Sequence, residues 1–374
     1  MRSEPAMLLL ALLAGSGPAP SGFAPAEPGH RWAFPRDHHL HPALRNEWWY
    51  FTGTLASAGP GGRSFGYQLT LFRAGLLPEP PALDSAWATG AAVMGHAAVT
   101  DPASGEHVFS EVLWRAVPAL GGFGAVGDPT LAWARAPPGT EGAWSVRLEE
   151  GGAFALSMRD DARGLALDLR ARPEGPPVLQ GPDGYSRKAP APGFATLYYS
   201  IPRLATEGSL TVGGLTWAVR GTSWLDREAG SSELAPGLVG WDWWGLRLAD
   251  GRALMLEALR EADGRVAWRT GTLVERDGRV RLLGQGEWTA EPRGTWRSPR
   301  TGAVYPSGWR VAVPSAGVQV VVEPELRSAE DVSRLVRGLA YWEGPVQVRA
   351  ADGSAAGEGY AELTGYAAGG RLPL

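Results

Sequence analysis

The sequence predicts an all-β protein built from two antiparallel β-barrels packed together, and three observations support this fold class. Of its 374 residues, 44% are hydrophobic and 20% are charged, which leaves enough apolar material for two cores. Glycine and proline contribute 52 and 31 residues, a composition typical of many turns and few long helices. Short runs of alternating apolar and polar residues recur along the chain, as expected of strands with one buried face.

The N-terminal half contains the clearest hairpin. Residues 65–72 alternate after a glycine-rich turn at residues 59–62. Antiparallel sheets of this size usually close on themselves, because closure removes exposed edges. Further alternating runs predict strands at residues 91–100, 111–116, 143–148, 153–158 and 165–170.

The C-terminal half has the spacing of an up-and-down meander. Asp-Gly pairs at residues 250–251, 263–264 and 277–278 separate apolar stretches, and such pairs favour hairpin turns. One helix is expected at residues 329–337, because Ser328 and Asp331 have the spacing of a capping box.

A pattern of residues that occurs twice in the sequence supports two similar domains. Glu47-Trp48-Trp49 and Asp242-Trp243-Trp244 are each followed by a glycine, a hairpin and an arginine. Duplication explains this order, and shared hairpin sequence preferences are the alternative. The predicted division is a signal peptide at residues 1–25, an N-terminal domain at 30–195 and a C-terminal domain at 205–370, with the boundary in the proline-rich stretch 190–206.

The amino terminus resembles an export signal. Arg2 precedes an apolar run at residues 7–14 and a stretch of small residues and prolines at 15–20. We expect a mature chain that begins between Gly17 and Ala26 and resides in the periplasm or outside the cell; a disordered alanine-rich start is the alternative. No segment reaches the length of a membrane span, so the protein is expected not to span a membrane.

Composition excludes several classes of function. The net charge of −4 has no long run of one sign, so nucleic acid is not an expected partner. Cysteine is absent, which excludes disulfides and thiolate chemistry. No metal site and no cofactor are predicted, since the neighbouring His38 and His39 point to opposite faces of an extended chain and, with His41, lack a second ligand cluster nearby in sequence.

The run from Gly221 to Glu228 carries the strongest candidate for catalysis. In a strand, Trp224, Asp226 and Glu228 share one face, so both carboxyls enter a barrel interior if the tryptophan does. Burial and nearby like charge raise a carboxyl pKa, which yields a neutral acid at pH 7. Asp226 and Glu228 are therefore the candidate catalytic residues. The alternative is a buried salt bridge to one of four arginines: Arg220, Arg227, Arg247 and Arg260.

Other acids also lie beside aromatic residues. Glu47, Asp242, Glu343 and Glu362 each occupy such a setting, which indicates an aromatic cavity with a few polar anchors for a large apolar ligand. The residues expected to bind this ligand are Trp224, Tyr198, Tyr199, Trp241, Trp243, Glu47, Trp49, Tyr67 and Trp342.

Six ordered motifs resemble the AttH-like family, whose relatives include carotenoid 1,2-hydratases and fungal Diels–Alderase-type cyclases. They occur at residues 47–53, 65–73, 221–228, 240–244, 341–344 and 359–366. The resemblance covers Trp32 to Tyr366 and implies two lipocalin-like barrels. It also implies cofactor-free chemistry, in which a buried acid protonates a terminal isoprenoid double bond and water adds to the cation.

Asp226 matches the family's proposed acid in its Trp-Leu-Asp-Arg-Glu setting. Two positions depart from the hydratase pattern. The run at residues 197–200 lacks a histidine, and Ala229 replaces an aromatic residue, which is expected to open space beside Asp226 and Glu228.

The expected function is therefore that of an exported lipocalin-like protein that binds a large isoprenoid or lipid-like molecule, with hydratase or lyase activity of the carotenoid 1,2-hydratase type. The alternatives are a non-catalytic carrier or cell-envelope factor, and a secreted hydrolase or cyclase of the same family.

Overall fold

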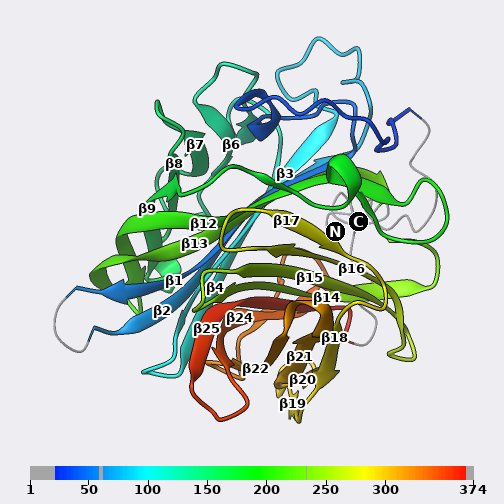
Figure 1. Ribbon diagram of the computed structural model, residues 1–374. Coiled ribbons are helices and arrows are strands. Elements are labelled where there is room, and N and C mark those ends of the chain that lie inside the picture. Colours follow the sequence, from blue (N-terminus) through cyan, green and yellow to red (C-terminus); the bar gives the residue numbers. More distant parts are fainter. Residues whose placement is uncertain (1–21, 59–61, 233, 368–374) are drawn as a thin grey trace.

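The computed structural model describes residues 22–58, 62–232 and 234–367 (Figure 1). In these ranges the chain forms strands, turns and four short 3₁₀ helices, and no α-helix, which confirms the all-β class. The predicted signal peptide, residues 1–25, lies almost wholly outside these ranges. None of their helices has the length and apolar character that a membrane crossing requires. The 3₁₀ helices are η1 (Arg36–His38), η2 (Asp161–Arg163), η3 (Pro182–Gly184) and η4 (Pro314–Ala316).

The first sheet has thirteen strands and forms a nearly closed barrel. Its main path runs β4-β3-β2-β1-β13-β12-β9-β8-β7-β6-β5, and β10 and β11 pair with β12. The indole of Trp114 in β4 donates to the carbonyl of Arg135 in β6 at 2.7 Å, which brings the two ends together. The strands are β1 (Asn46–Ser57), β2 (Ser64–Gly75), β3 (Ala91–Asp101), β4 (Glu106–Arg115), β5 (Gly121–Phe123), β6 (Thr130–Arg135), β7 (Ala143–Leu148), β8 (Phe154–Asp160), β9 (Leu165–Pro173), β10 (Val178–Leu179), β11 (Tyr185–Arg187), β12 (Ala195–Val212) and β13 (Leu215–Ser232).

The second sheet has ten strands in the order β17-β16-β15-β14-β25-β24-β22-β21-β18, with β23 paired to β24. It begins with the predicted meander, and Gly251, Gly264 and Gly278 have positive φ at its Asp-Gly turns. A separate hairpin, β19 (Thr295–Arg297) and β20 (Val304–Pro306), lies beside it. The strands are β14 (Leu238–Leu248), β15 (Ala253–Glu261), β16 (Val266–Val274), β17 (Val280–Leu283), β18 (Thr289–Pro292), β21 (Trp309–Val313), β22 (Val318–Pro324), β23 (Glu330–Val332), β24 (Ala340–Arg349) and β25 (Ala355–Thr364).

The chain changes sheet between Ser232 and Leu238, not in the stretch 190–206 where the sequence analysis placed the boundary. The long hairpin β12–β13 belongs to the first sheet because β13 pairs with β1 and β12 pairs with β9. The motif at residues 221–228 therefore belongs to the first barrel and not to a domain that starts at residue 205.

The helix predicted at residues 329–337 is wrong. Residues 330–332 form β23, and turns follow. The capping-box spacing is overridden by tertiary hydrogen bonds, because the Glu330 carboxylate accepts from the hydroxyls of Thr301 at 2.6 Å and Tyr305 at 3.0 Å.

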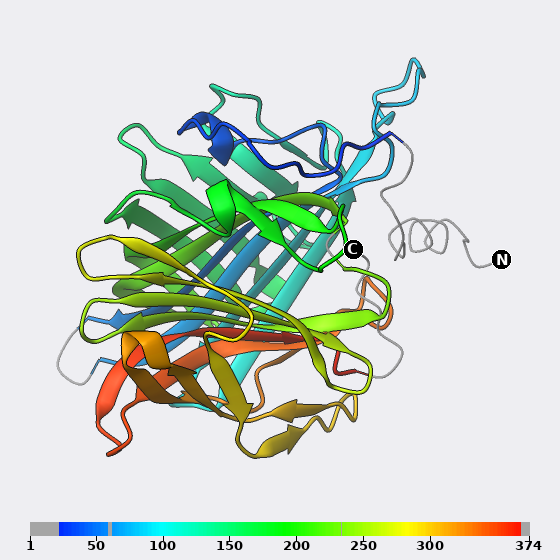
Figure 2. The same cartoon turned by 45° about the vertical axis from the view of Figure 1, so that its right-hand side comes forward.

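The two sheets pack against each other, so several strands are buried on both faces (Figures 1 and 2). In β13, every residue from Ser223 to Ser231 is buried. Its odd-numbered side chains, such as Leu225, face the core of the first barrel, and Trp224 joins Tyr50, Trp243 and other residues in an apolar cluster between the sheets. This double burial is the reason that the central strands have little polar alternation.

A close approach between the sheets limits side-chain size at Gly66. A Cβ atom added at this position in β2 would lie 2.5 Å from Cγ of Pro345 in β24. We expect Gly66→Ala to lower the free energy of unfolding by about 1–3 kcal/mol, because the rigid proline ring must move. Urea unfolding measures this effect. Gly175→Ala, which meets no atom within 4 Å, is the control, and equal losses in both variants would contradict the close packing.

Candidate functional site

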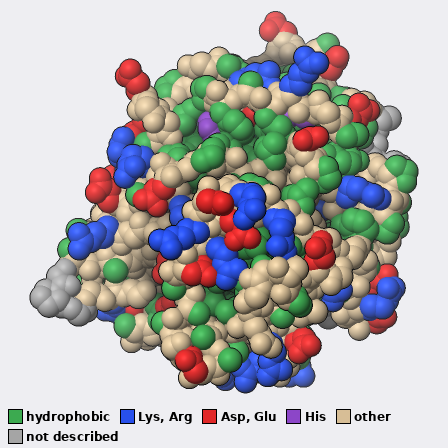
Figure 3. All heavy atoms as spheres, viewed as in Figure 1, with side chains coloured by type: hydrophobic (Ala, Val, Ile, Leu, Met, Phe, Trp, Pro, Cys, Tyr) green, Lys and Arg blue, Asp and Glu red, His purple; other side chains and the backbone are tan. Residues whose placement is uncertain are grey.

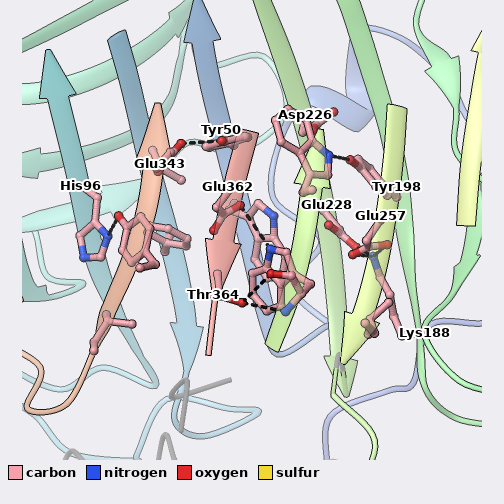
Figure 4. A pocket seen from close by; sticks show the side chains of 18 of the residues that line it. Tyr50, His96, Lys188, Tyr198, Asp226, Glu228, Glu257, Glu343, Glu362 and Thr364 are labelled. Atoms are coloured by element: carbon pink, nitrogen blue, oxygen red, sulfur yellow. Dashed lines mark hydrogen bonds and ion pairs between the residues drawn. The ribbon is translucent and has the colours of Figure 1, made fainter. Parts of the chain in front are cut away.

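A cavity lies between the outer face of the first barrel and the second sheet (Figure 4). Strands β1, β2, β3, β12 and β13 line one side, and β14, β15, β24 and β25 line the other. The two acids of the 221–228 motif therefore face the junction of the sheets and not a barrel interior. Leu225 and Arg227 take the opposite face of β13 and are buried inside the barrel.

The register of the strands arranges the side chains of the site in two rows, one on each sheet. On the first sheet, cross-strand partners place five polar side chains in a line: Ser200, Asp226, Tyr50, Thr70 and His96. A similar row crosses the second sheet through Glu257, Trp243, Glu362 and Glu343. Because partners in register point to the same side of a sheet, the fold brings residues from distant parts of the chain to one wall.

Asp226 is a cavity-lining carboxyl without a cationic partner among the described residues. Its Oδ1 accepts hydrogen bonds from the Ser200 hydroxyl and, at 2.7 Å, from Nε1 of Trp224. Burial raises the pKa of Asp226 to about 7, and these hydrogen bonds only partly oppose the shift. The residue therefore holds a proton in an appreciable fraction of molecules at neutral pH.

The hydroxyl of the tyrosine next to this acid is placed to donate a hydrogen bond to it. The Tyr198 hydroxyl accepts a hydrogen bond from Nε1 of Trp243 at 3.2 Å, which leaves its own hydrogen available to donate (Figure 4). Tyr198 occupies the run where the sequence analysis noted the missing histidine. Burial, and then the charge of Asp226, raise its pKa well above the ordinary value, so the phenol stays protonated.

Glu228 forms an ion pair, unlike Asp226. Nζ of Lys188 lies 2.6 Å from Oε1 of Glu228 and 2.9 Å from both carboxylate oxygens of Glu257. Thr196 donates a further bond to Glu228 at 2.5 Å. The sequence analysis gave a salt bridge to an arginine as the alternative role of this residue. The cation is instead Lys188, which lies between carboxylates from both sheets.

A second pair of acids faces the same cavity. Glu343 and Glu362 are direct cross-strand partners on β24 and β25. The Tyr50 hydroxyl donates to Glu343 at 2.5 Å, and the Trp241 indole donates to Glu362 at 3.3 Å. Burial raises the pKa of Glu362 to about 8, and burial with the facing Glu362 raises that of Glu343 well above its usual range. This pair therefore retains protons at neutral pH.

The remaining wall is aromatic and neutral. Nδ1 of His96 lies 2.7 Å from the Tyr341 hydroxyl, and burial lowers the His96 pKa to about 3. The imidazole is therefore uncharged. The cavity has about 90 Å³ of space for the centres of water molecules, whereas one water needs about 10–15 Å³ on the same measure. It can hold a compact apolar group with a water beside it.

The structure brings together some of the predicted site residues and separates others. Asp226, Glu228, Tyr198, Trp241 and Trp243 line the cavity, and Trp224 supports Asp226 from the cluster between the sheets.

The other predicted ligand-binding residues lie elsewhere, because neighbouring strand positions alternate between faces. Trp49, Tyr67 and Tyr199 are in the core of the first barrel, and Trp342 is in the core of the second sheet. Glu47 forms an ion pair with Arg227.

Ala229 does not open the cavity. It lies on the opposite face of β13 from Asp226 and Glu228 and packs with Ala26, Leu44 and Leu197. The expectation that it creates space beside the two acids is wrong, because a single step along a strand reverses the direction of the side chain.

Sequence reasoning missed Lys188, Glu257 and Tyr50, and treated Glu343 and Glu362 only as acids in aromatic settings. One signal was present. Lys188 is the single lysine of a chain with 34 arginines. An ammonium group is more compact than a guanidinium, which suits a buried position between two carboxylates.

By its fold and cavity, the protein is one in which two barrel-like β-sheets hold an aromatic, acid-lined site at their junction. The chain belongs to the AttH-like family, whose model matches residues 25–366, and the resemblance stated from the motifs is confirmed.

Solved structures support the same fold. The chain is similar to a protein from Nitrosomonas europaea whose assignment as AttH is provisional, with 34% identity, a TM-score of 0.79, and coverage of 92% of this chain and 100% of that one. Kievitone hydratase from Nectria haematococca (14% identity, TM-score 0.64) and CghA (13%, 0.50) each cover 94% of this chain and 98% of their own. No curated protein matches.

Loss of the lysine should destabilise the site strongly. Lys188→Met leaves two buried carboxylates without their cation, and we expect the free energy of unfolding to fall by about 3–5 kcal/mol. Chemical denaturation measures the loss. Arg265→Met breaks an exposed ion pair with Glu261 and should cost less than about 1 kcal/mol. Similar losses in both variants would show that the buried bridge contributes no more to the free energy of unfolding than the exposed ion pair.

The raised carboxyl pKa values predict that stability falls with increasing pH. Asp226 and Glu362 have pKa values raised from 3.8 to about 7 and from 4.5 to about 8. Between pH 4 and 8 the folded state therefore binds more protons than the unfolded state, so this contribution is present below about pH 4 and is lost as pH rises through the folded pKa values. Urea unfolding at pH 5 to 8 should show the decline. Asp226→Asn should make it shallower, and an unchanged slope would argue against a raised pKa.

Proposed function

We propose that this protein is a cofactor-free hydratase or hydro-lyase that acts on an unsaturated hydrophobic small molecule, with Asp226 as the general acid. The single observation that carries the proposal is the Asp226 carboxyl, which is buried, lines an aromatic cavity and has no cationic partner among the described residues. A general acid is most effective when its pKa is close to the working pH, and burial brings Asp226 to about 7.

The reaction balances with the groups in the cavity. Asp226 transfers its proton to one carbon of a C=C bond, and the other carbon becomes a cation. A water oxygen then bonds to that carbon, and the water loses a proton to a carboxylate. The sum is addition of water to the double bond, and elimination of water follows the same path in reverse. The Glu343–Glu362 pair, on the other wall, supplies the acceptor when one of its members is ionised.

The surroundings favour a cationic intermediate. The indoles of Trp48, Trp241 and Trp243 line the cavity, and aromatic faces attract positive charge. The carboxylates of Glu228 and Glu257 add negative potential, part of which Lys188 neutralises. The limited volume excludes bulk water, which restricts side reactions of the cation. A large isoprenoid or lipid-like ligand would place only its reacting end there.

The comparisons add support at the level of fold. Kievitone hydratase, a hydratase by name, shares the architecture at 14% identity, which leaves the reaction of this chain a proposal. Export of the mature chain to the periplasm or beyond is part of the same proposal and rests on the pattern of residues 1–25.

Extraction of the protein tests the ligand class. Mature protein purified from its native host is extracted with organic solvent and analysed by mass spectrometry against a mock purification. The recovered compound, kievitone and an acyclic carotenoid are then each incubated with the enzyme in ¹⁸O-labelled water. We expect an alcohol that contains the heavy oxygen. A ligand that binds in stoichiometric amount and is never altered would instead favour the carrier function.

The variant Asp226→Asn tests the acid directly. It keeps a hydrogen-bond acceptor for Ser200 and Trp224 but has no carboxyl proton, so we expect kcat to fall by at least about 100-fold with ligand binding retained. Asp160→Asn is the matched control, because Asp160 is also a buried aspartate that accepts from a serine, Ser110 at 2.5 Å, and it lies outside the cavity. Full turnover by Asp226→Asn would exclude Asp226 as the acid.

A further inference from the structure

A second cluster of polar side chains lies near the amino terminus, away from the cavity. His30, Asp37 and His41 each offer one atom of a type that binds metals, and these atoms all lie within 4.8 Å of one another. Oδ1 of Asp37 is 3.0 Å from Nε2 of His30 and 3.2 Å from Nε2 of His41. Ligands bonded to one tetrahedral zinc ion at about 2.0–2.1 Å are separated by similar distances.

A neutral His41 ring has too few N–H groups to donate to both of the carboxylates that it contacts. Both ring nitrogens of His41 face carboxylates, because Nδ1 lies 3.1 Å from Oε2 of Glu47 while Nε2 faces Asp37. A neutral imidazole carries one N–H, so one of the two contacts would place a nitrogen lone pair against a carboxylate oxygen. A cation at the centre of the cluster, or a second proton on the ring, removes this repulsion.

The groups around the cluster resemble an outer coordination shell. Glu47 fixes His41 through both its ring Nδ1 and its backbone N–H, the latter at 2.8 Å, and a carboxylate behind a ligating histidine is a recurrent arrangement at zinc sites. Arg227 holds Glu47 in turn. Oδ2 of Asp37 accepts from the backbone N–H of Ala33 at 2.5 Å and from Arg36 at 3.0 Å. Oδ1 faces the two histidines and also accepts from Arg36, at 3.3 Å.

The cluster also has an open side. A surface depression reaches it, and its further lining residues are Arg31, Arg36, Leu40, Pro42 and Val126. Side chains of His30 and His41 are 22% and 15% exposed. Histidines reach the surface in the upper part of Figure 3, where residues 22–45 cross the end of the first barrel in Figure 1. Solvent can therefore supply further ligands.

We propose that His30, Asp37 and His41 form a binding site for a divalent transition-metal ion, with zinc as the best match to a donor set of two imidazoles and one carboxylate. The two Nε2 atoms and Oδ1 of Asp37 are the protein ligands, and water completes the coordination. The ion cross-links the segment on both sides of η1, and Glu47 of β1 holds this segment through its hydrogen bonds to His41.

This site is independent of the cavity chemistry. The cavity acids lie on the other face of β13 from Arg227, so the metal takes no part in the proposed proton transfer. The prediction that the chain lacks a metal site rested on His38, His39 and His41 alone. His38 points instead to the Tyr199 hydroxyl, and the missing partners of His41 are His30 and Asp37.

Metal binding to a tag-free mature chain tests the site. The protein is treated with EDTA, dialysed and titrated with Zn²⁺ by isothermal calorimetry, with bound metal counted by mass spectrometry. We expect one zinc per chain and a rise in Tm on binding. Co²⁺ added to the stripped protein should produce the visible absorption of a low-coordinate nitrogen–oxygen site.

The variants locate the ion. We expect His30→Gln and Asp37→Asn each to weaken zinc binding by at least about tenfold, the lower end of the loss seen even for partners behind the ligands. His107→Gln is the matched control, since it alters a histidine–carboxylate pair, with Asp331 at 2.8 Å, that lies outside the cluster. Circular dichroism verifies the fold of each variant.

Two outcomes would overturn the proposal. If the wild-type chain takes up no zinc in stoichiometric amount, the second proton on His41 is the cation that balances the cluster. If His30→Gln and Asp37→Asn bind zinc as tightly as the wild type, the ion resides elsewhere.

Discussion

Five carboxyl groups are buried with a single ammonium group where the two sheets meet, and this imbalance of charge governs the protonation of the site. Asp226, Glu228, Glu257, Glu343 and Glu362 all line one cavity, and Lys188 is the only lysine or arginine among the described residues that line it. Full ionisation would leave four uncompensated negative charges in a region of low dielectric, which no fold of ordinary stability tolerates. Protons must therefore remain on some of these groups, so the packing of the sheets itself produces neutral acids at physiological pH.

Strand β13 links the cavity acids to the polar groups of the amino-terminal segment. On its outer face, Asp226 and Glu228 reach the cavity, and on its inner face Arg227 lies over the ring of Trp49 and holds Glu47. Glu47 in turn holds His41 of the amino-terminal segment. Since β13 is buried on both sides, each of these groups is positioned by a packed core, which limits the motion of the side chains in the site.

The proposed acid chemistry would draw on groups that line the cavity. Desolvation sets the protonation of the acids, aromatic faces accept developing positive charge, and hydrogen bonds from Tyr50, Trp224 and Trp241 fix the carboxyls. An apolar carrier would need only the aromatic lining. Placing several acids in that lining costs folding free energy, and the proposed acid chemistry would account for this cost.

Local patterns in the sequence predict the all-β class, the hairpins with Asp-Gly turns, and the shared face of Asp226 and Glu228, because turn chemistry and the two-residue period of a strand are local properties. What that face meets depends on how the two sheets pack. Periodicity states which side chains point together but not which layer covers them, so the acids lie between the sheets, and Trp49 and Tyr67 lie in the core of the first barrel. Lys188, Glu257 and Glu343 reach the site by pairing of distant strands and by packing of the two sheets, and a pattern along one strand carries no information about such contacts.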